Sequence, residues 1–355
     1  MRSVRILLSC LVALLVGSLA PSGALAGSST ASHHGPHGQE PSLLVSGLGS
    51  GSGSTVGPDG ALYIAEPAAG TIVRVAPRTG ATSTFAAGLP TRLAGFTVGG
   101  VTDVAFLGHR AYALVSVVGP DVGGTSVVGL YRIDGPTTST VVADIGAWSI
   151  AHPPATDFFV PSGVQYALQA WHGGFLVTDG HHNRVLRVST DGDISEVITF
   201  GNVVPTGLDV ARRLVYVALA GPVPHDPADG KVVAFTPGST TAADVAAGAP
   251  ILTDVELARH QHGHHSTHRH DGHHGERHGD QVYAISNGTY SGDPEGSPGL
   301  PDTGSLVKAN DSGGFDVVAD ALDRPTSLEL THGNAYVVTY DGEVWVVPLC
   351  HRSRH

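Results

Sequence analysis

The 355-residue sequence is poor in cysteine, methionine and charge, with two Cys, one Met and 14% charged residues. Globular domains usually carry about 25% charged residues, so long exposed helices laced with Glu–Lys pairs are not expected. The formal net charge is −12 at pH 7. Because nucleic-acid binding needs a basic surface, this charge excludes a nucleic-acid partner.

Long apolar runs are also scarce, and the main one lies at the N-terminus from Ile6 to Ala20. Arg2 and Arg5 precede this run, and Ala24 to Ala26 supplies small residues for a cleavage site. A membrane helix needs about 20 apolar residues, and Ser, Cys and Gly interrupt this run. The pattern predicts a signal peptide over residues 1–26 cleaved after Ala26, and hence a secreted protein without a membrane span.

Such cleavage would remove Cys10 and two arginines but no acidic residue, so the mature net charge would be −12 − 2 = −14. Cys350 would then be the single cysteine, which excludes an intramolecular disulfide. The fold must therefore be stabilised by a core built from the 41% hydrophobic residues. We expect a monomer, and the sequence assigns no role to Cys350.

Glycine, proline and β-branched residues are abundant, and they recur in a pattern of short strands and tight turns. The first repeat unit has four predicted strands, at Ser54–Gly57, Ala61–Ala65, Thr71–Ala76 and Ala81–Ala87. The second strand of the unit recurs at Ala111–Val115, Phe175–Thr178, Val215–Leu219, Val282–Ser286 and Ala335–Thr339. The third strand recurs at Val127–Ile133, Arg184–Val188, Lys231–Phe235, Ser305–Lys308 and Glu343–Val347.

These strands make six units, and the sixth stops after its third strand. A strand at Leu43–Gly47 precedes the first unit and can supply the missing one. The sequence therefore predicts an all-β, six-bladed β-propeller over residues 42–348, closed by an N-terminal strand in the last blade. Residues 27–41 are predicted as a disordered leader and residues 349–355 as a C-terminal tail. A β-sandwich or a solenoid does not account for the complementary terminal strand.

The third unit, Gly174–Val188, resembles an NHL repeat or a gluconolactonase-type propeller blade. The chain more closely resembles the ScyD/ScyE family of secreted propellers. That resemblance is carried by Val56–Glu66, Ala143–Trp148, Val204–Leu208, Ser286–Gly288 and Gly304–Val307. It extends over roughly residues 42–348 and implies the propeller fold, but it implies no defined chemistry because fold does not carry function.

Hydroxyl residues recur where the first strand of a blade begins, at Thr102, Ser162, Thr206, Thr253 and Thr326. Asp103 and Asp254 follow two of them, in blades two and five, which are opposite in a six-membered ring. These side chains form either a polar channel mouth that binds a cation or a hydroxylated ligand, or local caps for the turns. The local interpretation is the more common one for short loops.

Other acidic and amide residues are expected on the same face of the ring. The ligand-binding candidates are Glu66, Asp103, Asp179, Asn183 and Asp254. A calcium-dependent lactonase would need three or four converging oxygen ligands and a carboxylate base. Because the strand starts carry hydroxyls instead, calcium at the channel mouth is disfavoured, and the sequence assigns no catalytic residue.

Histidine supplies the clearest chemical signal, because a loop at residues 259–280 in blade five is rich in it. Its nine histidines are His260, His262, His264, His265, His268, His270, His273, His274 and His278. Neutral imidazole is a common ligand of Zn, Ni and Cu, so the loop is predicted to bind such metals. Alternatively, it is a tolerated low-complexity insertion without a selected role.

The sequence thus favours a secreted binding module for a small molecule, a glycan or a protein. The alternative is an enzyme at the channel mouth, either a lactonase-like hydrolase or a catalyst of oxidative chemistry on a phenolic substrate. Acidic side chains that converge at the mouth would favour the enzyme. An apolar or merely hydroxylated mouth would favour binding.

Overall fold

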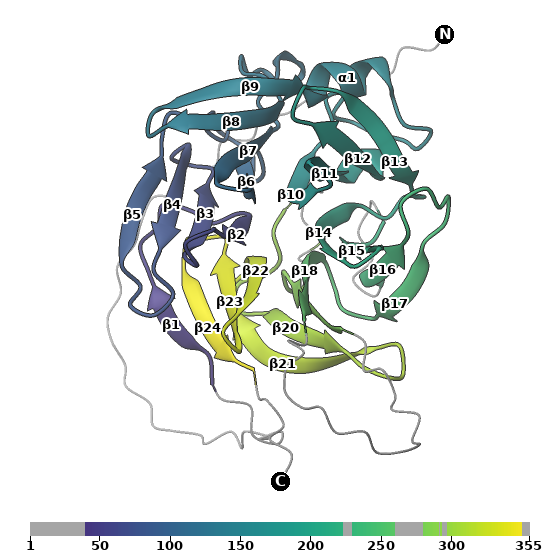
Figure 1. Ribbon diagram of the computed structural model, residues 1–355. Helices are drawn as coiled ribbons and strands as arrows, with labels where there is room; N and C mark the ends of the chain where they lie inside the picture. Colours follow the sequence, from purple (N-terminus) through teal and green to yellow (C-terminus); the bar gives the residue numbers. More distant parts are fainter. Residues whose placement is uncertain (1–39, 223–228, 260–279, 291, 293–296, 350–355) are drawn as a thin grey trace, which may run out of the picture. The chain divides into compact units, whose positions relative to one another are not determined.

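The computed structural model describes residues 40–222, 229–259, 280–290, 292 and 297–349. The predicted signal peptide and the nine histidines of the 259–280 loop lie outside the described residues. The described chain forms six four-stranded antiparallel sheets arranged as the blades of a propeller (Figure 1). The predicted fold is confirmed.

Each of the first five blades is made of four consecutive strands. Blade 1 contains β2 (Ser54–Val56), β3 (Leu62–Glu66), β4 (Thr71–Val75) and β5 (Thr82–Ala86). Blade 2 contains β6 (Gly100–Leu107), β7 (Arg110–Ser116), β8 (Gly129–Gly135) and β9 (Thr138–Asp144). Blade 3 contains β10 (Gln165–Trp171), β11 (Gly174–Asp179), β12 (Arg184–Ser189) and β13 (Ile194–Thr199).

Blades 4 and 5 repeat the arrangement. Blade 4 contains β14 (Pro205–Ala211), β15 (Leu214–Leu219), β16 (Lys231–Phe235) and β17 (Ala243–Ala247). Blade 5 contains β18 (Leu252–Ala258), β19 (Gln281–Ser286), β20 (Gly304–Ala309) and β21 (Phe315–Leu322). The 259–280 loop joins β18 to β19, at the opposite end of β18 from the blade-to-blade connection.

Blade 6 joins the two ends of the described chain. Its strands are β22 (Pro325–Thr331), β23 (Asn334–Thr339), β24 (Val344–Pro348) and β1 (Ser42–Val45). β1 pairs antiparallel with β24, with Ser42 opposite Val346 and Leu43 opposite Trp345. The N-terminal strand therefore closes the ring, as the sequence predicts, and covers an edge that would otherwise be open.

The core consists of a separate apolar cluster at each of the six blade interfaces. Strand β3 shows how these clusters arise, because all five of its residues are buried. Tyr63 packs toward blade 2, whereas Leu62 and Ile64 on the other face of the strand pack toward blade 6. A middle strand covered on both faces contributes to two clusters at once.

Helix is nearly absent from the described residues. The one α-helix is α1 (Ile145–Ala151), and two 3-10 turns lie at Pro120–Val122 (η1) and Gly180–His182 (η2). The Asp144 carboxylate caps α1 by accepting a hydrogen bond from the Ala147 amide at 2.8 Å. Among the described residues, no helix has both the length and the apolar character to cross a membrane.

Candidate functional site

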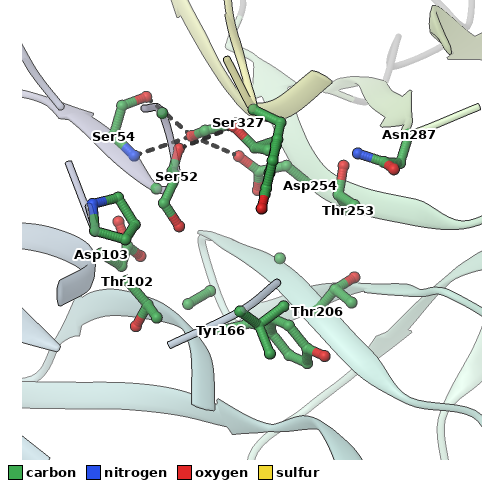
Figure 2. A pocket seen from close by; sticks show the side chains of 18 of the residues that line it. Ser52, Ser54, Thr102, Asp103, Tyr166, Thr206, Thr253, Asp254, Asn287 and Ser327 are labelled. Carbon is green, nitrogen blue, oxygen red and sulfur yellow. Dashed lines mark hydrogen bonds between the residues drawn. The ribbon is translucent and has the colours of Figure 1, made fainter. Parts of the chain in front are cut away.

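A cavity of about 170 Å³ lies where the inner strands of the blades begin (Figure 2). Its wall combines hydroxyl, carboxyl and amide groups from the inner strands and the connecting loops. The polar residues that line it include Ser52, Ser54, Thr55, Arg92, Thr97, Thr102, Asp103, Tyr166, Gln169, Thr206, Thr253, Asp254, Glu256, Asn287, Ser297, Thr326, Ser327, Glu329 and Tyr340. The loops that reach it are the blade-to-blade and second-to-third connections, so this is the face on which the sequence places the channel mouth.

The repeated hydroxyls at the strand starts mainly join one blade to the next. The Thr206 hydroxyl donates toward the carbonyl of Leu252 on blade 5, at 2.8 Å. The Thr253 hydroxyl donates to the Pro325 carbonyl on blade 6, at 3.0 Å. Thr326 reaches the Ser52 carbonyl of blade 1 at 3.2 Å. This repetition favours the local, structural interpretation of these residues.

Ser162 differs from the other four, because its hydroxyl is buried and has no hydrogen-bond partner among the described residues. It does not line the cavity. Its backbone amide donates to the Asp121 carboxylate at 2.9 Å. The residue therefore helps to hold the connection between blades 2 and 3.

Asp103 and Asp254 both line the cavity, and each carboxylate spans two blades. Asp103 accepts hydrogen bonds from the amide of Val104 at 2.7 Å and from that of Leu168 on blade 3 at 2.6 Å. Asp254 accepts from the amides of Val255 at 2.9 Å and Leu328 on blade 6 at 2.8 Å. These bonds use much of the acceptor capacity of both carboxylates and hold them in place.

The hydrogen bonds of Asp254 continue from its own blade to the two blades that follow it around the ring (Figure 2). The Ser327 hydroxyl lies 3.1 Å from the Asp254 carboxylate and 2.9 Å from the Ser54 hydroxyl. The Ser54 amide also donates to the Ser327 hydroxyl, at 3.0 Å. One polar chain therefore links blades 5, 6 and 1 along the cavity wall.

Two further carboxylates line the cavity at positions that the sequence analysis did not single out, Glu256 and Glu329. They lie two residues further along β18 and β22 than Asp254 and Ser327, which is about 7 Å deeper along the channel. The sequence does contain a pattern that could have identified them, in which a Thr is followed three residues later by an acidic residue. It occurs in three consecutive blades, at Thr206 and Asp209, Thr253 and Glu256, and Thr326 and Glu329.

The carboxylates in and beside the cavity raise one another's pKa values. Burial, with a smaller contribution from the neighbouring charge of Asp209, raises the pKa of Asp254 from 3.8 to about 7. Burial also raises the pKa of Glu256 well above its usual range, with Asp209 and Glu329 adding to the shift. Asp103 and Glu329 are shifted in the same direction, again chiefly by burial. Desolvation and like charge both favour the protonated form.

Glu256 differs from the aspartates in its contacts. Within the described ranges, no donor forms a hydrogen bond with the Glu256 carboxylate. Asp209, by contrast, is bonded by the amides of Val210 and Leu257 and by Arg259. Asp209 does not line the cavity. Glu256 is therefore the cavity carboxylate with the most acceptor capacity left for a ligand.

Arg92 provides positive charge at the cavity wall. Its Nη1 atom donates to the Tyr340 hydroxyl at 2.8 Å and to the Thr97 carbonyl at 3.2 Å. Its guanidinium carbon lies 5.1 Å from the centre of the Tyr340 ring, and that of Arg324 lies 5.6 Å from the same ring. These contacts fix Arg92 in place, since a cation over an aromatic face is attracted by the ring.

The other three candidates, Glu66, Asp179 and Asn183, are buried and do not line the cavity. Glu66 accepts hydrogen bonds from the Gly49 amide and the Thr71 hydroxyl. The Asn183 side-chain oxygen accepts from the amides of Val203 and Val204. The structure thus brings Asp103 and Asp254 to one cavity, whereas Glu66 and Asp179 end β3 and β11 and Asn183 follows the turn η2.

Asp179 is the centre of a buried polar network. Its carboxylate accepts hydrogen bonds from Arg184 Nε at 2.9 Å and from Gln165 at 2.9 Å, and it lies 3.1 Å from His182 Nδ1. Arg184 in turn donates to the His152 carbonyl and stacks over Trp148 of α1. The network holds the connection between blades 2 and 3 against the propeller.

Over the described part of the chain, no group of three or more His, Cys, Asp or Glu side chains is placed to hold a metal ion. Two of the five candidates meet at the cavity, but both are bonded to backbone amides. An oxygen-ligated calcium site needs six to eight ligands at 2.3–2.6 Å. The described residues do not offer that arrangement.

No protein-family model matches this chain, and no curated protein matches it in sequence. Solved structures do resemble it in fold. A gluconolactonase from Xanthomonas campestris has a TM-score of 0.56 at 11% identity, over 87% of this chain and 89% of that chain. The PQQ-bound aldose sugar dehydrogenase of Streptomyces coelicolor has a TM-score of 0.53 at 12% identity, over 88% and 99%.

Virginiamycin B lyase from Staphylococcus aureus has a TM-score of 0.50 at 11% identity, over 88% of this chain and 99% of that chain. These proteins have different activities on one architecture, and at such identities the likeness extends to the fold alone. The chain is therefore a six-bladed β-propeller, a fold that it shares with these solved structures.

Proposed function

We propose that the protein is a secreted binding module that takes a small polar molecule into the cavity at the channel mouth. One observation carries this proposal, namely the cavity of about 170 Å³ with hydroxyl, carboxyl and guanidinium groups in its wall. Ligand sites are typically concave and have a few fixed polar groups. Export follows from the predicted signal peptide at residues 1–26, and we propose a monomer of the ScyD/ScyE type.

A cavity-filling variant tests the binding site. Ala167 lies on the cavity wall, so Ala167→Leu should reduce the affinity for small polar molecules found in a screen by nuclear magnetic resonance. Ala243→Leu is the matched control, because Ala243 is exposed on β17. Equal affinities in the two variants, with both folded, would place binding elsewhere.

The second candidate is an enzyme at the same mouth, and the raised pKa of Asp254 favours it. A carboxyl group with a pKa of about 7 can act as a general acid or base at neutral pH. The acidic side chains that line the mouth also favour an enzyme, but binding ranks first because both Asp254 oxygens already accept hydrogen bonds. Since a gluconolactonase has this fold, glucono-δ-lactone is the first substrate to try. The enzyme would be favoured if the protein hydrolyses the lactone faster than buffer alone and if Asp254→Asn abolishes this activity.

The histidine loop is proposed as a second, independent binding element for Zn, Ni or Cu. Its support is the sequence alone, with nine imidazole groups between residues 260 and 278. Calorimetry of Zn and Ni against the full chain and against a chain lacking residues 260–278 tests it. Equal heats for the two proteins would refute metal binding by the loop.

A further inference from the structure

The cavity wall carries acidic and basic side chains in separate places. Glu256 and Glu329 lie on β18 and β22, in the deeper part of the channel. Arg92 lies in the connection between blades 1 and 2, on the same cavity. A ligand with one kind of charge would leave one of these ends without a partner, which is costly for a desolvated group.

The Glu256 carboxylate at the acidic end of the cavity and the Arg92 guanidinium at the basic end can both form further hydrogen bonds. No described residue donates to the Glu256 carboxylate, so its acceptor sites face the cavity unused. A guanidinium has five N–H donors, and Arg92 uses only its Nη1 atom, for Thr97 and Tyr340. The Nε and Nη2 donors of Arg92 form no hydrogen bond with any described residue. The guanidinium remains able to bind a carboxylate.

The size of the cavity limits the ligand. A volume of about 170 Å³ lies below the roughly 300–1,000 Å³ of pockets for drug-sized molecules. A metal ion is a poor match for the deeper acids, because no three acidic side chains of the described residues converge. An ammonium group is a better match, since it has three donors and needs only hydrogen-bond distances to its acceptors.

We propose that the cavity binds a small zwitterion, an amino-acid-like molecule whose ammonium group contacts Glu256 and Glu329 and whose carboxylate contacts Arg92. This assignment rests on the proposed binding function and names its ligand class. The ammonium group neutralises the deeper carboxylates, and the carboxylate completes the hydrogen bonding of the guanidinium. Neutral molecules and simple anions bring no positive charge that would stabilise the ionised form of Glu256 and Glu329.

Calorimetry on the full chain with a matched series of probes tests the ligand class. The zwitterions are glycine, β-alanine and 4-aminobutanoate; butylamine lacks the carboxylate, butanoate lacks the ammonium group, and glycerol and glucose are neutral. The buffer contains EDTA, so that metal bound to histidine does not recruit amino acids. We expect at least one zwitterion to bind about tenfold or more tightly than butylamine, and butanoate not to bind.

Variants of Glu256 and of Arg92 test the acidic end and the basic end of the cavity separately. Glu256→Gln and Arg92→Gln should each weaken zwitterion binding about tenfold or more, with Glu40→Gln and Arg78→Gln as exposed controls. Glu256→Gln should also raise the melting temperature at pH 7.5, because the folded protein opposes the ionisation of Glu256 that the unfolded chain allows at that pH. A more stable protein that binds less tightly is not expected if Glu256 has only a structural role.

Other results would overturn the assignment in distinguishable ways. Equal affinities for butylamine and the best zwitterion would show that Arg92 does not bind the carboxylate of the ligand. Binding of glycerol or glucose with no zwitterion bound would refute the ligand class and leave the binding cavity intact. No binding by any probe at millimolar concentration would refute the assignment. Unchanged affinity in a folded Glu256→Gln variant would do the same.

Discussion

Gly207 of blade 4 lies against Asp254 of blade 5 so closely that a Cβ atom at Gly207 would be 2.2 Å from Asp254 Oδ1. The same relationship holds between Gly53 of blade 1 and Asp103 of blade 2, also at 2.2 Å. Each aspartate also accepts an amide hydrogen bond from the following blade. Both carboxylates are thus enclosed by three successive blades, on opposite sides of the ring.

This packing predicts that Gly207→Ala destabilises the protein by about 1–3 kcal/mol or more. The added methyl group would also lie 2.4 Å from the Asp254 Cα atom, so rotation of a side chain cannot relieve the clash. Thermal or urea unfolding measures the effect. Gly201→Ala is the matched control, because nothing lies within 4 Å of a Cβ atom there. Equal stability of the two variants would contradict the packing.

The raised carboxyl pKa values predict that the protein becomes less stable as pH rises from about 4 to about 7. Asp254 has a pKa of about 7 in the folded state against 3.8 normally, so between these values the folded chain holds a proton that the unfolded chain releases. The unfolding free energy then falls with pH, by up to about 1.4 kcal/mol per pH unit for each such group.

Glu256 contributes to the same trend, because burial and the charges of Asp209, Glu329 and Asp254 raise its pKa, while Arg259 acts in the opposite direction. Glu256→Gln removes one titrating group, so its stability should depend less steeply on pH than that of the unaltered protein. Urea unfolding at pH 4.5, 5.5, 6.5 and 7.5 measures the slope. Glu40→Gln should keep the original slope, and a steeper slope in Glu256→Gln would count against the assigned shift.

Closure of the ring predicts a sharp boundary for N-terminal truncation. Removal of residues 1–39 leaves β1 and its pairing with β24 intact, whereas removal of residues 1–47 exposes the edge of β24. The longer truncation also deletes Val45 from the core between blades 6 and 1. We expect a lower melting temperature and self-association of the longer truncation in size-exclusion chromatography. Equal behaviour of both truncations would show that β1 is dispensable.

Asp179 is predicted to affect stability rather than ligand binding. Asp179→Asn would remove the buried carboxylate 2.9 Å from the Arg184 guanidinium, which is 1% exposed, and leave it only the half-exposed Glu196 at 3.7 Å as a charged partner. Loss of one partner of a buried pair costs about 3–5 kcal/mol. The melting temperature should fall while the affinity of the remaining folded protein for the best probe stays within about twofold. Asp193→Asn on an exposed turn is the control.

The blades were predictable because strand and turn signals repeat along the chain. The predicted third strand Arg184–Val188 corresponds to β12 at Arg184–Ser189, and Leu43–Gly47 corresponds to β1 at Ser42–Val45. β-Branched residues and glycine-containing turns act locally, so one sequence reveals them. The closure of the ring was predictable from the number of strands, because the sixth unit lacks one strand and a separate strand precedes the first unit.

The cavity was harder to predict because its residues depend on register and on irregular loops. Asp103 and Asp254 were found from the strand starts, but each inner strand has a register shift there, for example between Val101 and Asp103. One inserted residue changes which side chains face the channel. Arg92 belongs to an irregular connection, so its position follows from tertiary contacts such as that with Tyr340. No local pattern predicts such contacts.

The pairing of β1 with β24 also determines the order of events during folding. β1 is synthesised before every other strand of the propeller, yet its partner is the last. Until β24 is available, the apolar side chains shared by blades 6 and 1 cannot be covered from both sides. Contacts so distant in sequence form slowly, because a large loop must close first. Completion of the ring therefore has to wait until β24 has been synthesised, so the ring stays open while the other strands form.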